Sequence, residues 1–299
     1  MIDAFIDVLE TIPRGLVFVA LGFAVIVIAK FARDIITPYK IDDEVIGKKN
    51  LAVAVRLSGY FIGVILVFLG ALYQPLTAAP VDGAVGGLGF DQEFAESVLR
   101  VFLYSLAGIA ALNLVRILMN RVILYKFDIE KEVVEGQNVG SGAAEFGMYV
   151  ATGLLIAGSV AGQGGGPDTA AAFFGMGLVL LVLFALFYQL TTPYDLHSEI
   201  EGNNTAVGIA FGGNLIGIGL VTFKAVFGDF DGWTSGIASF ITFGVIGFAL
   251  LYVMRLLIDK LLLPTVSTSR ALSVERNMGV AFIESAVVIS SALILFLAI

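Results

Sequence analysis

Long apolar runs alternate with short polar connectors along the chain. Eight runs predict helices, because each is long enough to cross a hydrocarbon core of about 30 Å and because backbone in lipid must satisfy its own hydrogen bonds. The expected spans are Arg14–Ile36, Asn50–Leu76, Ser97–Leu124, Asn138–Gly162, Thr169–Leu190, Asn204–Phe227, Trp233–Leu262 and Asn277–Ile299. The predicted fold class is all-α, a polytopic transmembrane helical bundle of four hairpins in the lipid bilayer.

The connectors are of two kinds. Those at Ala79–Gly89 and Gly162–Pro167 are rich in glycine, whereas the connectors inside the hairpins are charged. All but three of the 17 Lys and Arg residues lie near the charged connectors, the exceptions being Arg14, Arg100 and Lys224. The positive-inside rule therefore places the charged connectors in the cytoplasm and both termini outside.

An asparagine opens every second span. Asn50, Asn138, Asn204 and Asn277 are each followed by small residues two and four positions later, and acidic residues precede them. An Asn side chain caps the first free amides of a helix, and small residues allow a neighbouring helix to approach closely in lipid. We therefore predict four helix-capping positions in a repeated hairpin.

The hairpins alternate between two types. The first and third share Thr37-Pro38-Tyr39 and Thr192-Pro193-Tyr194, whereas the second and fourth share an Arg 22 residues before the asparagine and a Glu seven residues after it. The predicted unit is therefore four helices long and occurs twice, as residues 1–162 and 163–299. Because each unit has an even number of spans, both copies are expected in one orientation, related by an axis along the membrane normal.

The charges shared by the second and fourth hairpins are Arg116 with Glu145 and Arg255 with Glu284. Ionisable groups inside a span are costly and usually face a partner or water. At 1.5 Å per residue, Arg and Glu lie roughly 16 and 12 Å from the connector, so an ion pair is expected within each hairpin. These four residues are the candidate intramembrane polar site, either as links that fix hairpin register or as part of an ion or solute path.

Other polar residues have simpler interpretations. Arg56, alone in its span, is expected to have a structural role, with its side chain extended to the lipid headgroups. Asn214 is expected to hydrogen-bond across helices, and His197 to lie in a solvated turn rather than to bind a metal. Glycines repeated within the spans indicate close packing of helices; they include Gly59, Gly63, Gly147, Gly213 and Gly217.

Composition narrows the classes of function. Hydrophobic residues make up 58% of the chain and charged residues 14%, against roughly 25% charged in soluble proteins. A net charge of −8 and the lack of a basic stripe argue against nucleic-acid binding. There is no cysteine and one histidine. Thiolate metal sites are therefore excluded, and His197 is the only residue that could serve as the histidine of a catalytic triad. We expect no enzymatic activity and no cofactor.

One stretch also resembles a known family. It runs from Thr192-Pro193-Tyr194-Asp195 through Glu199-Ile200-Glu201-Gly202-Asn203-Asn204 to the glycine-rich face of residues 206–217. This stretch resembles the DUF350 (YjfL-like) family of bacterial inner-membrane proteins, and residues 47–54 match it more loosely, so the chain is similar to two tandem family units. The pairs Lys49-Asn50 and Asn203-Asn204 depart from the Gly-Asn pair that is commoner in the family.

The resemblance implies a location in the bacterial inner membrane but no biochemical role. By family association it suggests PspA-like envelope-stress proteins or ATP-grasp ligases as cytoplasmic partners. Two functions stay open: a transporter or channel for an ion or small solute, and a non-catalytic scaffold that docks cytoplasmic proteins through its charged loops. An intramembrane enzyme is a third class without a supporting motif. Association into a homo-oligomer is also left open.

Overall fold

The computed structural model describes residues 2–77, 92–162, 164–264 and 267–298, and every element in these ranges is a helix. Within these ranges, eight helices are long and apolar enough to cross a membrane. They are α1 (Ile2–Ile36), α2 (Leu51–Thr77), α3 (Gln92–Leu118), α5 (Val139–Val160), α6 (Pro167–Thr191), α8 (Thr205–Val226), α9 (Trp233–Leu257) and α11 (Met278–Ala298). The predicted all-α transmembrane class is confirmed. The glycine-rich connector predicted at Ala79–Gly89 lies outside the described residues.

Each charged connector contains a short helix that hydropathy did not predict. The first is a π-helical turn, η1 (Asp43–Gly47), and the others are α4 (Ile129–Val134), α7 (Leu196–Glu201) and α10 (Thr268–Ser273). The helices α3 and α9 also continue into π-helical turns, η2 (Met119–Ile123) and η3 (Ile258–Leu262). Local capping explains two of the short helices, because Asp128 and Asp195 accept hydrogen bonds from the first amides of α4 and α7.

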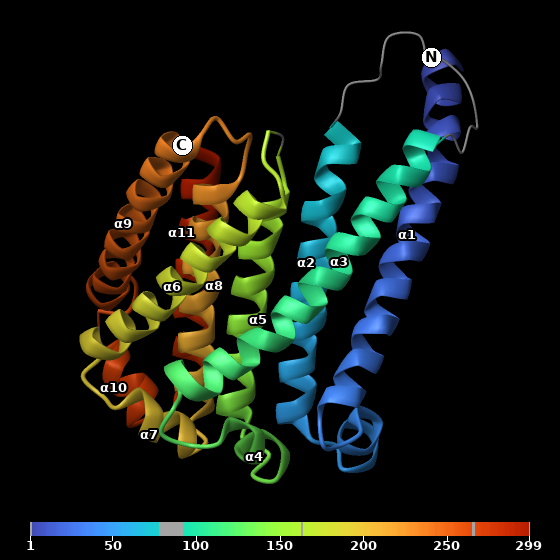
Figure 1. Cartoon of the computed structure of the whole chain (residues 1–299). Helices are drawn as coiled ribbons and strands as arrows, with labels where there is room; N and C mark the ends of the chain where they lie inside the picture. The colour runs from blue at the N-terminus through green and yellow to red at the C-terminus, as the bar shows by residue number, and fades with distance from the viewer. Residues whose placement is uncertain (1, 78–91, 163, 265–266, 299) are drawn as a thin grey trace.

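The four helices that follow an asparagine pack side by side in one row, with α2 against α5, α5 against α8 and α8 against α11 (Figure 1). We call them the capped helices. The helices α3, α6 and α9 each lie against two neighbours in this row, and α1 packs on α2 and α3. The helices α5 and α8 each have a capped helix on both sides. As a result, 83% of the most apolar 18-residue stretch of each is buried inside the bundle.

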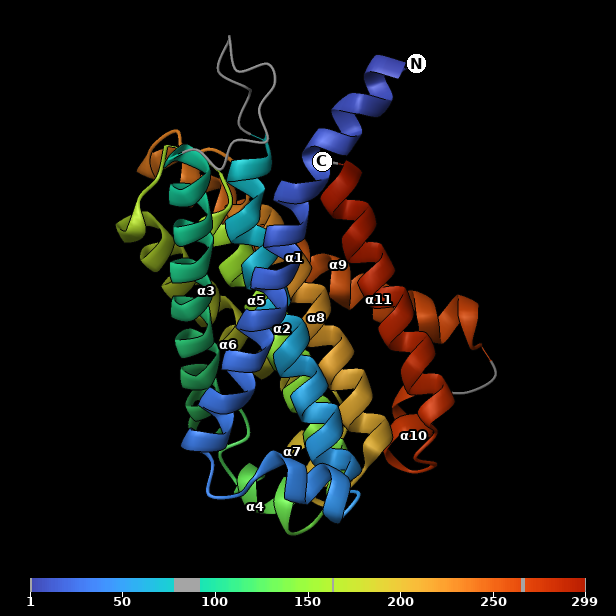
Figure 2. The ribbon, with the colours of Figure 1, turned by 90° about the vertical axis from the view of Figure 1, so that its right-hand side faces the viewer.

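We call the end of the bundle that holds the four asparagines and the connector helices the cap end. Two views, a quarter turn apart, place the start of α1 and the end of α11 at the opposite end from α4, α7 and α10 (Figures 1 and 2). All four capped helices therefore begin at the cap end and run in the same direction.

The three contacts between capped helices repeat one register. The residue nine positions after the asparagine of one helix meets the residue eight positions after the asparagine of the next. The pairs are Gly59 with Phe146, Gly147 with Gly212, and Gly213 with Ser285. A Cβ atom on any of the three glycines at the ninth position would overlap the facing residue, so glycine is what lets these backbones approach.

The residue before each asparagine has a left-handed backbone conformation. The φ angles of Lys49, Gln137, Asn203 and Arg276 are 54°, 46°, 54° and 49°. Glycine adopts this conformation most easily, and other residues except Asn and Asp pay roughly 1–2 kcal/mol for it. A glycine at this position would adopt the same conformation at lower cost. The same turn occurs four times, once in each hairpin.

Candidate functional site

The asparagines join successive hairpins as well as capping helices. Asn138 Oδ1 accepts a hydrogen bond from the Ser141 amide at 2.9 Å. Asn138 Nδ2 donates to the carbonyl oxygens of Ile200 (2.8 Å) and Glu201 (3.1 Å) at the end of α7, and to Glu132 Oε2 (3.2 Å) in its own connector. We call the contact from this amide to the connector helix of the next hairpin the asparagine bridge.

The bridge occurs at three of the four asparagines. Asn50 reaches the end of α4 through the Val133 carbonyl at 3.0 Å, and Asn204 reaches the end of α10 through the Leu272 carbonyl at 2.9 Å. Asn277 caps α11, but its side chain is exposed and no hairpin follows it in the described part of the chain. The asparagines are therefore both caps and links between neighbouring units.

The first polar site joins α2, α3, α4 and α5. Arg116 Nη1 donates to Glu130 Oε2 at 3.0 Å, and Arg56 Nη1 donates to Glu130 Oε2 at 3.1 Å and to Glu145 Oε2 at 3.2 Å. The charges thus form a chain in the order Arg116, Glu130, Arg56, Glu145. The predicted direct pair of Arg116 with Glu145 is wrong. Arg116 pairs instead with Glu130 of α4, which packs on α2, and Glu145 pairs with Arg56.

Arg56 is the central group of this site, and its predicted extension to the headgroups is also wrong. The residue is 1% exposed, and its Nη2 donates to the hydroxyl of Tyr39. Nearby, Arg33 lies over the rings of Tyr60 and Tyr149, with 5.6 Å to each centroid, a geometry that stabilises a desolvated cation. Neither Arg33 nor Tyr39 was predicted to belong to the site.

The groups outside the spans have shifted ionisation. Burial favours the neutral form of Glu130, but the guanidinium groups of Arg56 and Arg116 outweigh it and hold the pKa of Glu130 below its ordinary value of 4.5. Burial raises the pKa of Tyr39 to about 12. At neutral pH Glu130 is therefore a carboxylate, and Tyr39 keeps its proton.

The second polar site is built from the fourth hairpin and its neighbours. Arg255 Nη2 donates to Ser269 Oγ at 2.9 Å, and Arg255 lies 5.6 Å from the ring centroid of Tyr188. Glu284 Oε1 accepts from Asn214 Nδ2 at 3.0 Å, so the cross-helix hydrogen bond expected of Asn214 is confirmed. The predicted pair of Arg255 with Glu284 is wrong, since each has a different partner.

The two sites occupy equivalent positions with compensating differences. Ser269 stands eight residues before its asparagine, as Glu130 does, and Ala210 stands six residues after its asparagine, as Arg56 does. The second site therefore lacks one anion and one cation together. Arg56 and Arg116 balance Glu130 and Glu145 in the first site, as Arg255 balances Glu284 in the second, and Arg33 is a further buried cation beside the first site.

Each intramembrane glutamate uses one oxygen and leaves the other without a protein partner. Glu145 and Glu284 are both 1% exposed, and Glu145 Oε1 and Glu284 Oε2 have no hydrogen-bond partner among the described residues. Arg255 Nη1 and the Tyr149 hydroxyl share this property. Buried polar atoms in native proteins are normally satisfied by protein or ordered water, so water or a small ligand can bind these atoms. The two carboxylate oxygens can also take up a proton, whereas the Arg255 nitrogen only donates.

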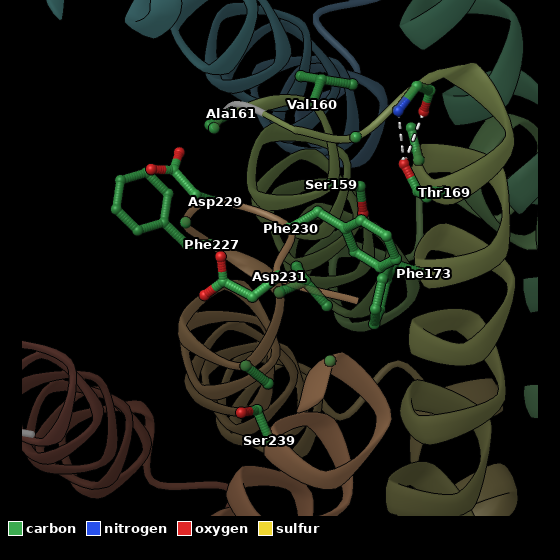
Figure 3. A pocket seen from close by; sticks show the side chains of 18 of the residues that line it. Ser159, Val160, Ala161, Thr169, Phe173, Phe227, Asp229, Phe230, Asp231 and Ser239 are labelled. Carbon is green, nitrogen blue, oxygen red and sulfur yellow. Dashed lines mark hydrogen bonds between the residues drawn. The ribbon is translucent and has the colours of Figure 1, made fainter. Parts of the chain in front are cut away.

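A separate cavity of about 550 Å³ lies at the end opposite the cap end, between the Gly165–Pro167 segment and the loop that follows α8. Figure 3 shows the carboxylates of Asp229 and Asp231 beside it. Lys224 also lines it. Lys224 is ten residues beyond Asn214, about 15 Å along the helix, so this cavity is separate from the second polar site.

Comparison with known sequences decides the family. The profile of the Domain of Unknown Function (DUF350) matches residues 7–160 and 164–299. The chain belongs to the DUF350 family. The resemblance drawn from the asparagine motifs is thus confirmed, and two DUF350 segments follow one another along the chain.

Several curated DUF350 relatives are described as membrane proteins. The UPF0719 transmembrane protein of Aquifex aeolicus is 23% identical over 275 residues, covering 90% of this chain and 94% of that protein. The Bacillus subtilis UPF0719 transmembrane protein YshE is 31% identical over 91 residues, or 30% of this chain and 64% of its own. The Escherichia coli K12 UPF0719 inner membrane protein YjfL is 37% identical over 46 residues, which cover 15% of this chain and 35% of that protein. No solved structure matches. This DUF350 chain is a multi-pass membrane protein.

One further polar residue of the DUF350 chain is placed differently from the prediction. His197, expected in a solvated turn, is 6% exposed, and its Nε2 lies 2.9 Å from the Ile123 carbonyl oxygen. Beside it, Lys126 binds Asp195 at 2.8 Å and holds the pKa of that carboxyl at about 2. The prediction assumed an irregular connector. The connector instead forms α7, which buries His197 against η2.

Proposed function

We propose that this DUF350 protein is a transporter or channel-like protein for an ion or small solute. In this proposal Glu145 and Glu284 bind the transported cation or an accompanying proton. The observation that carries it is the pair of equivalent, buried carboxylates, each with one oxygen held by the protein and one without a protein partner. A charge at this depth is costly and commonly marks an ion or proton path.

The surroundings of the two glutamates support exchange rather than a fixed link. A group that served only to fix hairpin register would be stabilised most by partners on both oxygens. Here Arg255 Nη1 and the Tyr149 hydroxyl are also without protein partners, so several donors lie in the same regions as the acceptors. A carboxyl group in such a region can take up or release a proton, or accept a cation, without rearrangement of the helices.

Flux through liposomes tests the proposal. Purified protein is reconstituted with the pH dye pyranine inside, and a potassium gradient with valinomycin sets the membrane potential. Uptake of radioactive rubidium is measured in separate liposomes without valinomycin, because valinomycin itself carries rubidium. We expect flux of protons or rubidium above that of protein-free liposomes. We also expect Glu145→Gln and Glu284→Gln each to lower it at least tenfold.

Glu135→Gln is the matched control, because Glu135 is an exposed carboxylate of a connector. It is expected to leave the flux unchanged. If the wild-type protein carries neither ion, or if both buried variants match it while remaining folded by circular dichroism, the proposed path is wrong. The polar sites are then structural, and a scaffold is the remaining function.

We also propose that the cap end faces the cytoplasm of a bacterial inner membrane. The excess of Lys and Arg near the charged connectors supports this orientation. Alkaline phosphatase fused after Ile299 is expected to be active, since it folds only outside the cytoplasm, and the same enzyme fused after Gln137 is expected to be inactive. The reverse pattern would contradict the orientation.

A further inference from the structure

The row of capped helices has two ends, and each end presents half of the contact that occurs three times inside the row. We call the side of a capped helix that meets the next one its forward face, and the side that meets the preceding one its backward face. Within the described residues, the forward face of α11 and the backward face of α2 have no capped helix against them. They lie at opposite ends of the row (Figure 1).

The residues at these two ends follow the register of the internal contacts. The ninth position after an asparagine is Gly59, Gly147 and Gly213 in the internal contacts, and in α11 it is Ala286, which is exposed. The eighth position in α2 is Ser58, which is also exposed. Both side chains are small, and small residues at a helix surface allow the close approach that drives helix association in lipid.

Polar groups at the cap end complete the match. The exposed Asn277 has an amide that makes no asparagine bridge. The bridge of Asn50 ends on the carbonyls of Val133 and Val134, which stand five and four residues before the next asparagine. The residues at those positions in the first hairpin are Val45 and Ile46, in η1. An exposed apolar face is ordinary for a helix in lipid. Here one end of the row also has an unused donor, the Asn277 amide, and the other end has the matching carbonyls of Val45 and Ile46.

Apolar side chains near both ends of the row are also exposed, which fits a missing contact at each end. Ile46 is 74% exposed, although its equivalent Val134 is only partly exposed where the second hairpin meets the first. Val274, in the turn before Asn277, is 72% exposed. These apolar side chains lie in connectors outside the spans, where contact with another protein surface would remove them from water.

We infer that copies of this chain associate head to tail in the membrane. The forward face of α11 packs on the backward face of α2 of the next copy, and Asn277 forms the asparagine bridge with Val45 and Ile46 of that copy. The contact continues the one already made between α2 and α5, α5 and α8, and α8 and α11. Because it joins two different surfaces, it generates a ring if the rotation closes and an open row if it does not. The inference is independent of the transport proposal.

Disulfide cross-linking tests the contact on a clean background, because the chain has no cysteine. Cells co-expressing Ser58→Cys and Ala286→Cys chains, oxidised in intact membranes, are expected to give a product of twice the chain mass. The double variant is expected to give a ladder of multiples. Each single variant alone is expected to stay at one chain mass, since a head-to-tail contact pairs position 58 with position 286.

A matched pair uses Leu256→Cys, on the exposed surface of α9 beside Arg255 and close to the depth of Ser58, together with Ser58→Cys; random collision in the bilayer would cross-link this pair as well. The inference is wrong if Ser58→Cys with Ala286→Cys gives no product above this control, or if either single variant dimerises as strongly.

A second measurement separates the bridge from the fold. Asn277→Asp keeps the oxygen that caps α11 and removes the amide donor. We expect the purified wild type in lipid nanodiscs of adequate size to have the mass of several chains, and Asn277→Asp to shift the population at least fivefold towards one chain with unchanged helix content. A wild type found as one chain at all concentrations in nanodiscs overturns the inference, and so does a variant that assembles as the wild type does.

Discussion

Replacement of Arg56 by methionine is expected to destabilise the bundle by about 3–5 kcal/mol, the range for removing one partner of a buried ion pair. Arg56 is the only cation within salt-bridge distance of Glu145 among the described residues, and Glu145 is 1% exposed. The variant therefore leaves a carboxylate in the membrane without its counter-ion. Reversible unfolding in mixed detergent micelles, followed by circular dichroism at pH 7, measures the loss.

The double variant Arg56→Met with Glu145→Met separates the charge from the packing. Replacing both partners of a buried pair by apolar residues is often close to neutral, so we expect it to recover most of the stability lost in Arg56→Met. Glu130 retains Arg116 in both variants. At pH 7 Glu130 is fully charged, because its lowered pKa means that its contribution is complete above about 4.5 and is lost as the pH falls further. A double variant as unstable as the single one would show that the Arg56 side chain acts through packing alone.

Asn138→Ala is expected to cost about 2–4 kcal/mol. A lost cap contributes about 1 kcal/mol, and each lost hydrogen bond to the carbonyls of Ile200 and Glu201 about 0.5–1.5 kcal/mol. Asn277→Ala is the control for the cap, because Asn277 caps its helix without a bridge inside the chain. Measured in a single-chain preparation, it is expected to cost about 1 kcal/mol. Equal losses in the two variants would show that the bridge contributes nothing.

The spans and the caps were predictable because their signals are local. The eight predicted spans reappear as helices in the same order, and α9 begins at Trp233 as expected. The four asparagines each accept the amide hydrogen bond that capping requires. Both results depend on residues a few positions apart, where hydropathy and capping chemistry act directly.

The partners inside the polar sites were not predictable in the same way. Arg116 and Glu145 lie at similar depths, and depth alone does not tell which groups face one another. Glu130 lies outside the predicted spans, in a charged connector, yet α4 brings it to Arg56 and Arg116, and Arg56 comes from a different hairpin. Spacing gave no signal either, because the position 14 residues after the Arg holds Glu130 in one hairpin and Ser269 in the other.

The parallel row of capped helices has an electrostatic consequence. Each helix has the equivalent of roughly half a positive charge at its first turn, and at the cap end four such charges lie beside one another. At the first three, a glutamate close to the asparagine opposes that charge, since Glu44, Glu132 and Glu199 each accept from the capping amide. In the last hairpin Ala271 stands where Glu44 and Glu132 stand in theirs. Glu275, two residues before Asn277, is paired with Arg270 at 3.5 Å. The start of α11 therefore keeps the least compensated positive potential of the four, and an anionic group near the end of the row would be attracted there first.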